Sequence, residues 1–131
     1  MKDRTCLVTG IPISEMSEKY YNLLGIEMTR LRTELEDAIE NAVKRGYDRF
    51  ISGAEIGSDT IAQWACEELF WERDNLEFVK TLDVRKEVYN SSMLIAIYDG
   101  NQKSSIYPII NEAKKNNLEI IIILPQEQFK L

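Results

Sequence analysis

The chain contains no histidine, so any acid or base that it uses must be a carboxylate, tyrosine, lysine or cysteine. Serine–histidine–aspartate and cysteine–histidine catalysis cannot be built from this chain alone, and a histidine-ligated zinc site is excluded. Glu55 and Asp59 lie four residues apart, and Asp99 is a third carboxylate that could approach them. Paired carboxylates can hydrolyse an N-glycosidic bond when their environments separate their pKa values. Glu55 and Asp59 are therefore the candidate catalytic residues.

Residues 53–59 form the segment whose pattern points most clearly to a ligand. A strand ends at Gly53, a turn passes through Gly57, and a helix opens with Ser58 and Asp59. Free backbone amides at such a helix start, with the helix dipole behind them, suit a phosphate or carboxylate. Neither GxxxxGK[ST] nor GxGxxG is present, so a P-loop nucleotidase or an ordinary dinucleotide oxidoreductase is not supported. The competing interpretation is a tight turn in which Asp59 only caps the helix.

Five short apolar runs indicate the strands that position these residues. They span 5–9, 49–52, 76–82, 92–98 and 119–124. The last run has no polar alternation, which is typical of a strand covered on both faces in a parallel sheet. Ligands bind at the carboxyl ends of parallel strands, so the expected site is the edge where these runs end.

Helices are expected between the strands. Apolar residues recur at spacings of three and four over 28–43, with Gly46 as the C-terminal cap. Further helices are predicted over 58–73 and 104–116, with Pro108 in the first turn of the latter or delaying its start, and one or two turns over 83–90. This alternation predicts a Rossmann-like, doubly wound α/β domain over 1–131: five mainly parallel strands in the order 3-2-1-4-5, with helices on both faces.

The amino-acid composition limits the kinds of partner that we expect for this chain. The 131 residues include 16 basic and 22 acidic side chains, and the net charge of −6 argues against nonspecific nucleic-acid binding. No apolar run is long enough to cross a membrane and the polar start lacks a signal-peptide core, so we expect a cytoplasmic protein. Cys6 and Cys66 lack metal-type spacing and are predicted to be buried thiols. We expect no metal site and identify no cofactor.

Three segments resemble the YpsA-like branch of the SLOG superfamily, which also contains DNA-processing protein A and the Lonely Guy nucleotide phosphoribohydrolases. They are residues 51–62 (ISGAEIGSDTIA), 8–10 (VTG) and 94–100 (LIAIYDG). The resemblance covers most of the chain, and its central segment is moderately specific. It implies a Rossmann-like domain that binds a nucleotide or a nucleotide-derived anion across the strand ends.

The resemblance assigns the binding residues by position. Thr9 and Gly10 fall at the end of the first strand, and Asp99 and Gly100 at the end of the fourth. The loop on the phosphate side supplies Gly53, Ala54, Gly57, Ser58 and Asp59.

The chain also departs from the family. The second glycine-rich turn is replaced by 101–105, where Ser104 could supply donors at a helix start. The stretch between the third and fourth strands is short, so Arg85 is only a candidate replacement for a family pocket residue. The family's hydrolase signature is missing as well, which ranks catalysis below binding.

Trp64 and Trp71 lie seven residues apart, on one side of the second predicted helix and off its main apolar stripe. We expect them to be covered by a second subunit, which favours a homodimer, or by the shortened neighbouring segment, with a partly exposed core position as the alternative. The favoured function is binding of a nucleotide-like small molecule. The alternatives are a hydrolase that cleaves an N-glycosidic bond and a degenerate family member that serves a protein partner only.

Overall fold

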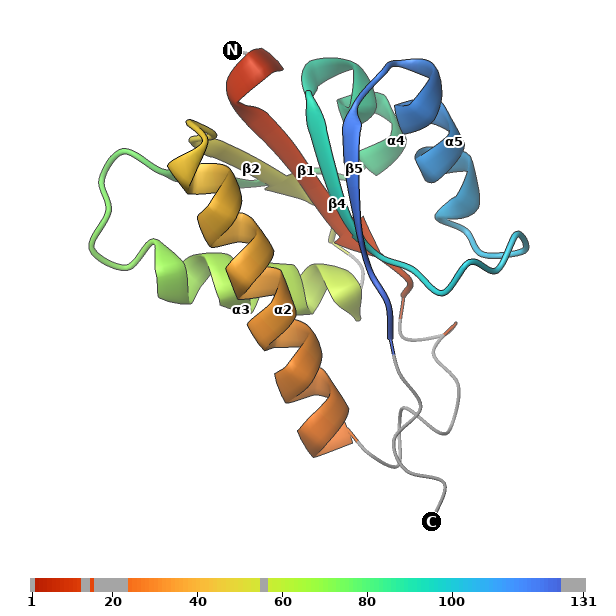
Figure 1. Ribbon diagram of the computed structural model, residues 1–131, viewed down its shortest axis with the longest axis horizontal. Helices are drawn as coiled ribbons and strands as arrows, with labels where there is room; N and C mark the ends of the chain where they lie inside the picture. The colour runs from red at the N-terminus through yellow and green to blue at the C-terminus, as the bar shows by residue number, and fades with distance from the viewer. Residues whose placement is uncertain (1, 13–14, 16–23, 55–56, 126–131) are drawn as a thin grey trace.

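Five parallel strands form one sheet in the order β3-β2-β1-β4-β5 (Figure 1). The computed structural model describes residues 2–12, 15, 24–54 and 57–125, with the backbone alone at 2 and 24–28. The strands are β1 (Thr5–Gly10), β2 (Arg49–Ser52), β3 (Glu77–Lys80), β4 (Met93–Ile97) and β5 (Glu119–Ile123). The predicted Rossmann-like α/β class and strand order are confirmed.

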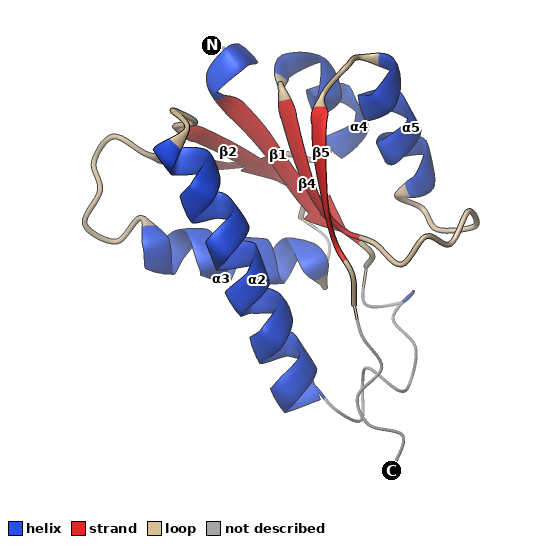
Figure 2. Cartoon of the chain, viewed as in Figure 1, coloured by secondary structure: helices blue, strands red, loops and turns tan. Residues whose placement is uncertain are grey.

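Helices cover both faces of the sheet (Figure 2). They are η1 (Lys2–Arg4), α2 (Leu24–Lys44), α3 (Ser58–Leu69), α4 (Val84–Glu87), η3 (Val88–Asn90) and α5 (Tyr107–Lys115). α2 and α3 pack together on one face, and α4 and α5 lie on the other. The short 83–90 connection forms one α turn and one 3-10 turn, as predicted, and Pro108 lies in the first turn of α5.

β1 and β4 form the centre of the core, and every residue of both strands is buried. Their register places Val8 opposite Ile95 and Gly10 opposite Ile97. Strand order reverses between these two strands, because β1 leads outward to β2 on one side and β4 leads to β5 on the other. A crevice is expected at the carboxyl ends of the strands beside such a reversal.

In the inward stripe predicted for α2, Leu31, Leu35, Ile39 and Ala42 are buried, and Ala38 and Val43 are partly buried against the core. Both cysteines are free, buried thiols, as predicted. Burial raises the pKa of Cys66 to about 12 and raises that of Cys6 well above its ordinary value. Neither thiol is a nucleophile near neutral pH, because the reactive form of cysteine is the thiolate.

The outer parts of the sheet differ from the predictions. β5 is not covered on both faces, since Ile122 is 43% and Leu124 54% exposed. Its apolar run was misleading because the strand order places β5 at an edge. β3 is shorter than the predicted 76–82, and Leu82 beyond it is 98% exposed. α3 ends at Leu69 rather than near 73, and α5 begins at Tyr107 rather than 104.

None of the helices within the described ranges is both long enough and apolar enough to span a membrane.

Candidate functional site

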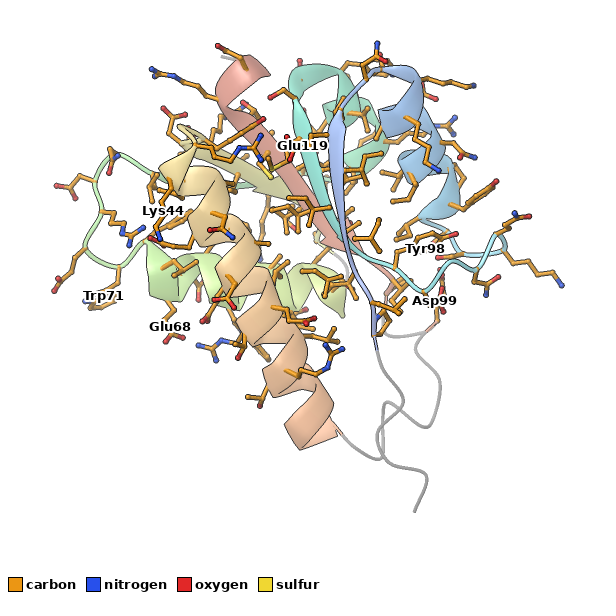
Figure 3. All side chains as sticks on the ribbon, viewed as in Figure 1. Lys44, Glu68, Trp71, Tyr98, Asp99 and Glu119 are labelled. Atoms are coloured by element: carbon orange, nitrogen blue, oxygen red, sulfur yellow. The ribbon has the colours of Figure 1, made fainter. Side chains whose placement is uncertain are left out.

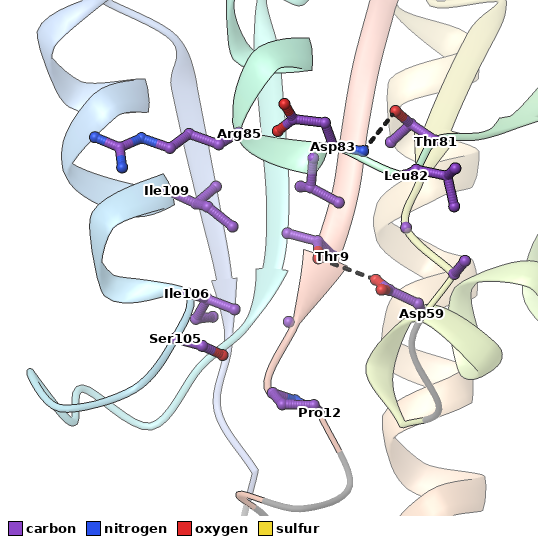
Figure 4. Close-up of a pocket in the computed structure, with 14 residues that line it drawn as sticks. Thr9, Pro12, Asp59, Thr81, Leu82, Asp83, Arg85, Ser105, Ile106 and Ile109 are labelled. Atoms are coloured by element: carbon purple, nitrogen blue, oxygen red, sulfur yellow. Dashed lines mark hydrogen bonds between the residues drawn. The ribbon is translucent and has the colours of Figure 1, made fainter.

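A pocket of about 340 Å³ lies at the carboxyl ends of the strands, at the predicted edge of the sheet (Figure 4). The end of β1, the β2–α3 connection, the β3–α4 connection and the start of α5 all contribute to its wall. The lining residues are Thr9, Gly10, Pro12, Gly53, Ala54, Asp59, Thr81, Leu82, Asp83, Val84, Arg85, Ser105, Ile106 and Ile109. Five of the predicted binding residues are among them: Thr9, Gly10, Gly53, Ala54 and Asp59.

Asp59 is a buried carboxylate of this pocket, with only 7% of its surface exposed. Its Oδ1 accepts hydrogen bonds from Thr9 Oγ1 at 2.9 Å and from Ser52 Oγ at 3.2 Å. The structure therefore corrects the capping interpretation, because Gly57 is the N-cap of α3 and the Asp59 side chain bonds to the ends of β1 and β2. Its negative charge still lies in that first turn, where the helix dipole stabilises it.

Gly53 makes room for this carboxylate. A Cβ atom at Gly53 would lie 2.4 Å from Asp59 Oδ2 and 2.8 Å from Val84 Cγ2. These distances are shorter than any nonbonded contact a side chain accepts, so the absence of a side chain at Gly53 allows Asp59 to lie against the backbone.

Two amides at the start of α3, those of Gly57 and Ser58, are paired within the protein and are not free for the predicted anion grip. Gly57, with φ of 127° and ψ of −122°, is the N-cap, and its N–H donates to Thr60 Oγ1 at 3.3 Å. Ser58 N–H donates to Ile11 O at 3.3 Å, and Ser58 Oγ donates to the same oxygen at 2.7 Å. The chain leaving β1 thus crosses the helix start and pairs with it, which sequence alone could not reveal. Gly57 and Ser58 are buried behind the pocket and do not line it.

The residues after β4 also lie away from the pocket lining. Asp99 and Gly100 are exposed, and Asp99 Oδ1 accepts a hydrogen bond from Asn101 N at 3.0 Å. The approach of Asp99 to Asp59 is therefore not observed. The second carboxylate of the pocket is Asp83, which caps α4 by accepting from Lys86 N at 3.2 Å. Glu55, the other predicted catalytic carboxylate, lies outside the described residues.

The hydrogen-bond donors of Ser104 and Ser105, which were expected to face a ligand, bind the carboxylate of Glu15 instead. Ser104 Oγ donates to Glu15 Oε1 at 2.5 Å, and Ser105 N–H donates to both carboxylate oxygens at 3.2 Å. The Ser105 hydroxyl donates to Oε2. Burial acts to raise the pKa of Glu15, but these hydrogen bonds outweigh it and the pKa is lowered. Ser104 is therefore engaged within the protein rather than turned to the pocket.

We expect Glu15→Gln to lower the free energy of unfolding by about 1 kcal/mol at pH 7, because a carboxylate held by several donors becomes a neutral amide. A lowered pKa in the folded state adds stability above the ordinary glutamate pKa of about 4.3, and this stability is lost as the pH falls through the lowered value. Urea unfolding at pH 7 and pH 3 checks this. The difference between the two proteins should shrink at pH 3, and an equal difference at both values would contradict the assignment.

The lining of the pocket contains both negatively and positively charged side chains. Asp59 and Asp83 supply carboxylates, and Arg85 supplies a guanidinium. Figure 4 shows Arg85 extended along α5, on the far side of Thr9 from Asp59. Its guanidinium lies 3.8 Å from Glu112 Oε2, and 62% of its side chain is exposed. Arg85 thus lies at the pocket wall, where it was only a candidate from the sequence.

Several residues that line the pocket or lie beside it were not predicted from the sequence. Thr81 and Asp83 follow the carboxyl end of β3, so the rule that selected the other strand ends would have found them. Glu15 had no signal of this kind, because its partners lie 89 and 90 positions away along the chain.

No protein-family model matches the chain, and no curated protein sequence matches it. The fold and the pocket define an α/β protein of the Rossmann-like class. The resemblance to the SLOG superfamily stays a prediction.

Proposed function

We propose that the protein binds a nucleotide-derived small molecule in the pocket at the strand ends, as a binding module of the SLOG type. The observation that carries the proposal is the pocket itself, about 340 Å³ in volume and lined by five residues selected for binding from the sequence. This volume is at the lower end of the range for small-molecule sites, which suits a ligand of nucleoside monophosphate size.

The lining supports one orientation of the ligand. Carboxylates accept hydrogen bonds from sugar hydroxyls, so the ribose is placed beside Asp59 and Asp83. The phosphate is placed toward Arg85, because a guanidinium binds phosphate oxygens through two parallel hydrogen bonds. The amides of Gly57 and Ser58 take no part, since both are paired within the protein.

Calorimetric titration with AMP, GMP, CMP and UMP, and with the four nucleosides, tests the proposal. We expect saturable binding of at least one monophosphate, and binding of its nucleoside roughly tenfold weaker because the charge-assisted bonds to Arg85 are lost. Arg85→Gln should make the affinity for the monophosphate nearly equal to the affinity for its nucleoside. Lys86→Gln is the matched control, because it removes the same charge from the neighbouring position of α4 without touching the pocket lining. The proposal would be contradicted if no ligand gave a heat of binding. It would also be contradicted if Arg85→Gln and Lys86→Gln weakened binding of the monophosphate equally.

Hydrolysis of an N-glycosidic bond stays the alternative prediction. Chromatography of the same monophosphates after incubation with the protein tests it through the released base. Base release that is abolished by Asp59→Asn would rank the hydrolase above the binding module.

The predicted homodimer through Trp64 and Trp71 also stays a prediction. Its support is that the two indoles are 48% and 84% exposed. Sedimentation velocity tests it, and the charge of the same surface, described in the next subsection, favours a different occupant.

A further inference from the structure

The outer side of α3 and the turn that follows it carry two exposed indoles, Trp64 and Trp71, with carboxylates between them. Trp64 is 48% and Trp71 84% exposed, and the intervening Glu67 and Glu68 are exposed as well. Trp64, Glu67 and Glu68 are three and four residues apart and so lie on one side of α3, and Trp71 in the following turn lines the same groove. Together with Arg32 of α2, these four residues line a groove of about 590 Å³, which we call the tryptophan face. Figure 3 shows Trp71 and Glu68 pointing away from the sheet near the C-terminal end of α3.

A second groove continues this surface past Trp71. It measures about 360 Å³ and is mostly apolar. Its lining residues are Cys66, Glu67, Phe70, Trp71, Leu76 and Phe78. Glu67 and Trp71 line both grooves. A peptide segment of another protein that lay along both grooves would therefore contact an indole and a carboxylate where the grooves meet.

The charge of the tryptophan face is negative. Glu67 and Glu68 belong to it, and exposed Glu72 follows Trp71. Arg32 is its only basic lining residue, and it is held by ion pairs to Glu68 and, at 3.0 Å, to Glu36. The nearby Arg73 is engaged by Glu40 at 2.9 Å.

This charge argues against a second copy as the occupant. A two-fold interface apposes the same patch from both subunits, so the carboxylates of one copy would face those of the other. Like charges brought together across an interface oppose association. A cation over an indole face is attracted to the ring, and a carboxylate beside it can bind the same cation.

We propose that the tryptophan face docks a basic segment of another protein, with an arginine or lysine side chain lying between the indoles of Trp64 and Trp71. Glu67 supplies the carboxylate between them, and the apolar groove beyond Trp71 receives the neighbouring part of the segment.

Tryptophan emission reports on this surface alone, because the chain has two tryptophans and both lie on it. The probe is an acetylated and amidated peptide of alternating glycine and arginine, six residues long. We expect a saturable change in emission, and roughly tenfold weaker binding of the same peptide with citrulline in place of arginine, since citrulline is neutral.

The double variant Glu67→Gln/Glu72→Gln should weaken binding of the arginine peptide about fivefold. The matched control is Glu34→Gln/Asp37→Asn, which changes the net charge by the same amount in the groove between α2 and β5. The control should alter the affinity by less than about twofold. Unchanged emission, or equal weakening by both double variants, would overturn the proposal.

Trp71→Ala separates a basic partner from a second copy. The side chain is 84% exposed, so its removal should leave the fold intact. Calorimetry should show the arginine peptide binding this variant roughly tenfold more weakly than the wild type. Sedimentation velocity should show the wild type as a monomer, and a dimer that Trp71→Ala dissociates would overturn the proposal in favour of a second copy.

Discussion

Gly10→Ala is expected to lower the free energy of unfolding by about 3 kcal/mol and the melting temperature by roughly 10 °C. A Cβ atom at Gly10 would lie 2.6 Å from the backbone oxygen of Ile97 and 2.6 Å from Ser58 Oγ. The Ile97 oxygen also accepts the Ile11 N–H at 3.0 Å, so neither β4 nor the start of α3 can move away without losing contacts. Differential scanning calorimetry measures the change.

Gly100→Ala is the control for this prediction. Gly100 has a φ of 89°, but a Cβ atom there would meet nothing within 4 Å. Only backbone strain of about 1 kcal/mol is expected, since L residues adopt positive φ at a modest cost. Equal losses in the two variants would show that the close approach at Gly10 is not the cause.

Asp59→Ala is expected to weaken binding of the preferred nucleoside monophosphate by roughly 10- to 100-fold, the usual effect of losing a charged hydrogen-bond partner. It should also lower the free energy of unfolding by about 2 kcal/mol, because the buried Thr9 and Ser52 hydroxyls lose their acceptor. Calorimetric titration and urea unfolding measure the two effects separately.

Asp59→Asn distinguishes the structural role of this residue from its binding role. The amide oxygen can still accept the bonds from Thr9 and Ser52, so most of the stability should be retained. The charge is lost, so affinity should still fall. Full affinity in Asp59→Asn would show that the carboxylate does not contact the ligand.

The sheet order could be predicted because its causes are local. Buried strands such as Thr5–Gly10 and Met93–Ile97 have apolar runs, and helices with a regular inward stripe separate the strands. The exposure of β5 is consistent with the predicted order, which places this strand at an edge, but its apolar run alone indicated a strand covered on both faces. An isoleucine-rich run satisfies the same pattern at the centre or at the edge of a sheet, and only the assembled order decides how much of it is covered.

The site was predicted in part for a similar reason. The rule that ligands bind at strand ends selected Thr9, Gly53 and Asp59 correctly as residues that line a pocket. It could not show that the chain after β1 pairs with the amides before α3, or that Glu15 binds Ser104 and Ser105. Those contacts join distant positions, and side-chain direction at Asp59 depends on the two hydroxyls that converge on it.

The central claim is that the pocket at the strand ends is where a nucleotide-derived ligand binds, and a nuclear magnetic resonance titration of ¹⁵N-labelled protein tests it most directly. On addition of the monophosphate with the highest affinity, the amide signals of Thr9, Gly53 and Arg85 should shift together and saturate, while that of Trp71 in the turn after α3 should not move. Shifts confined to α3 beyond the pocket, or no saturable shift at these three positions, would contradict the claim.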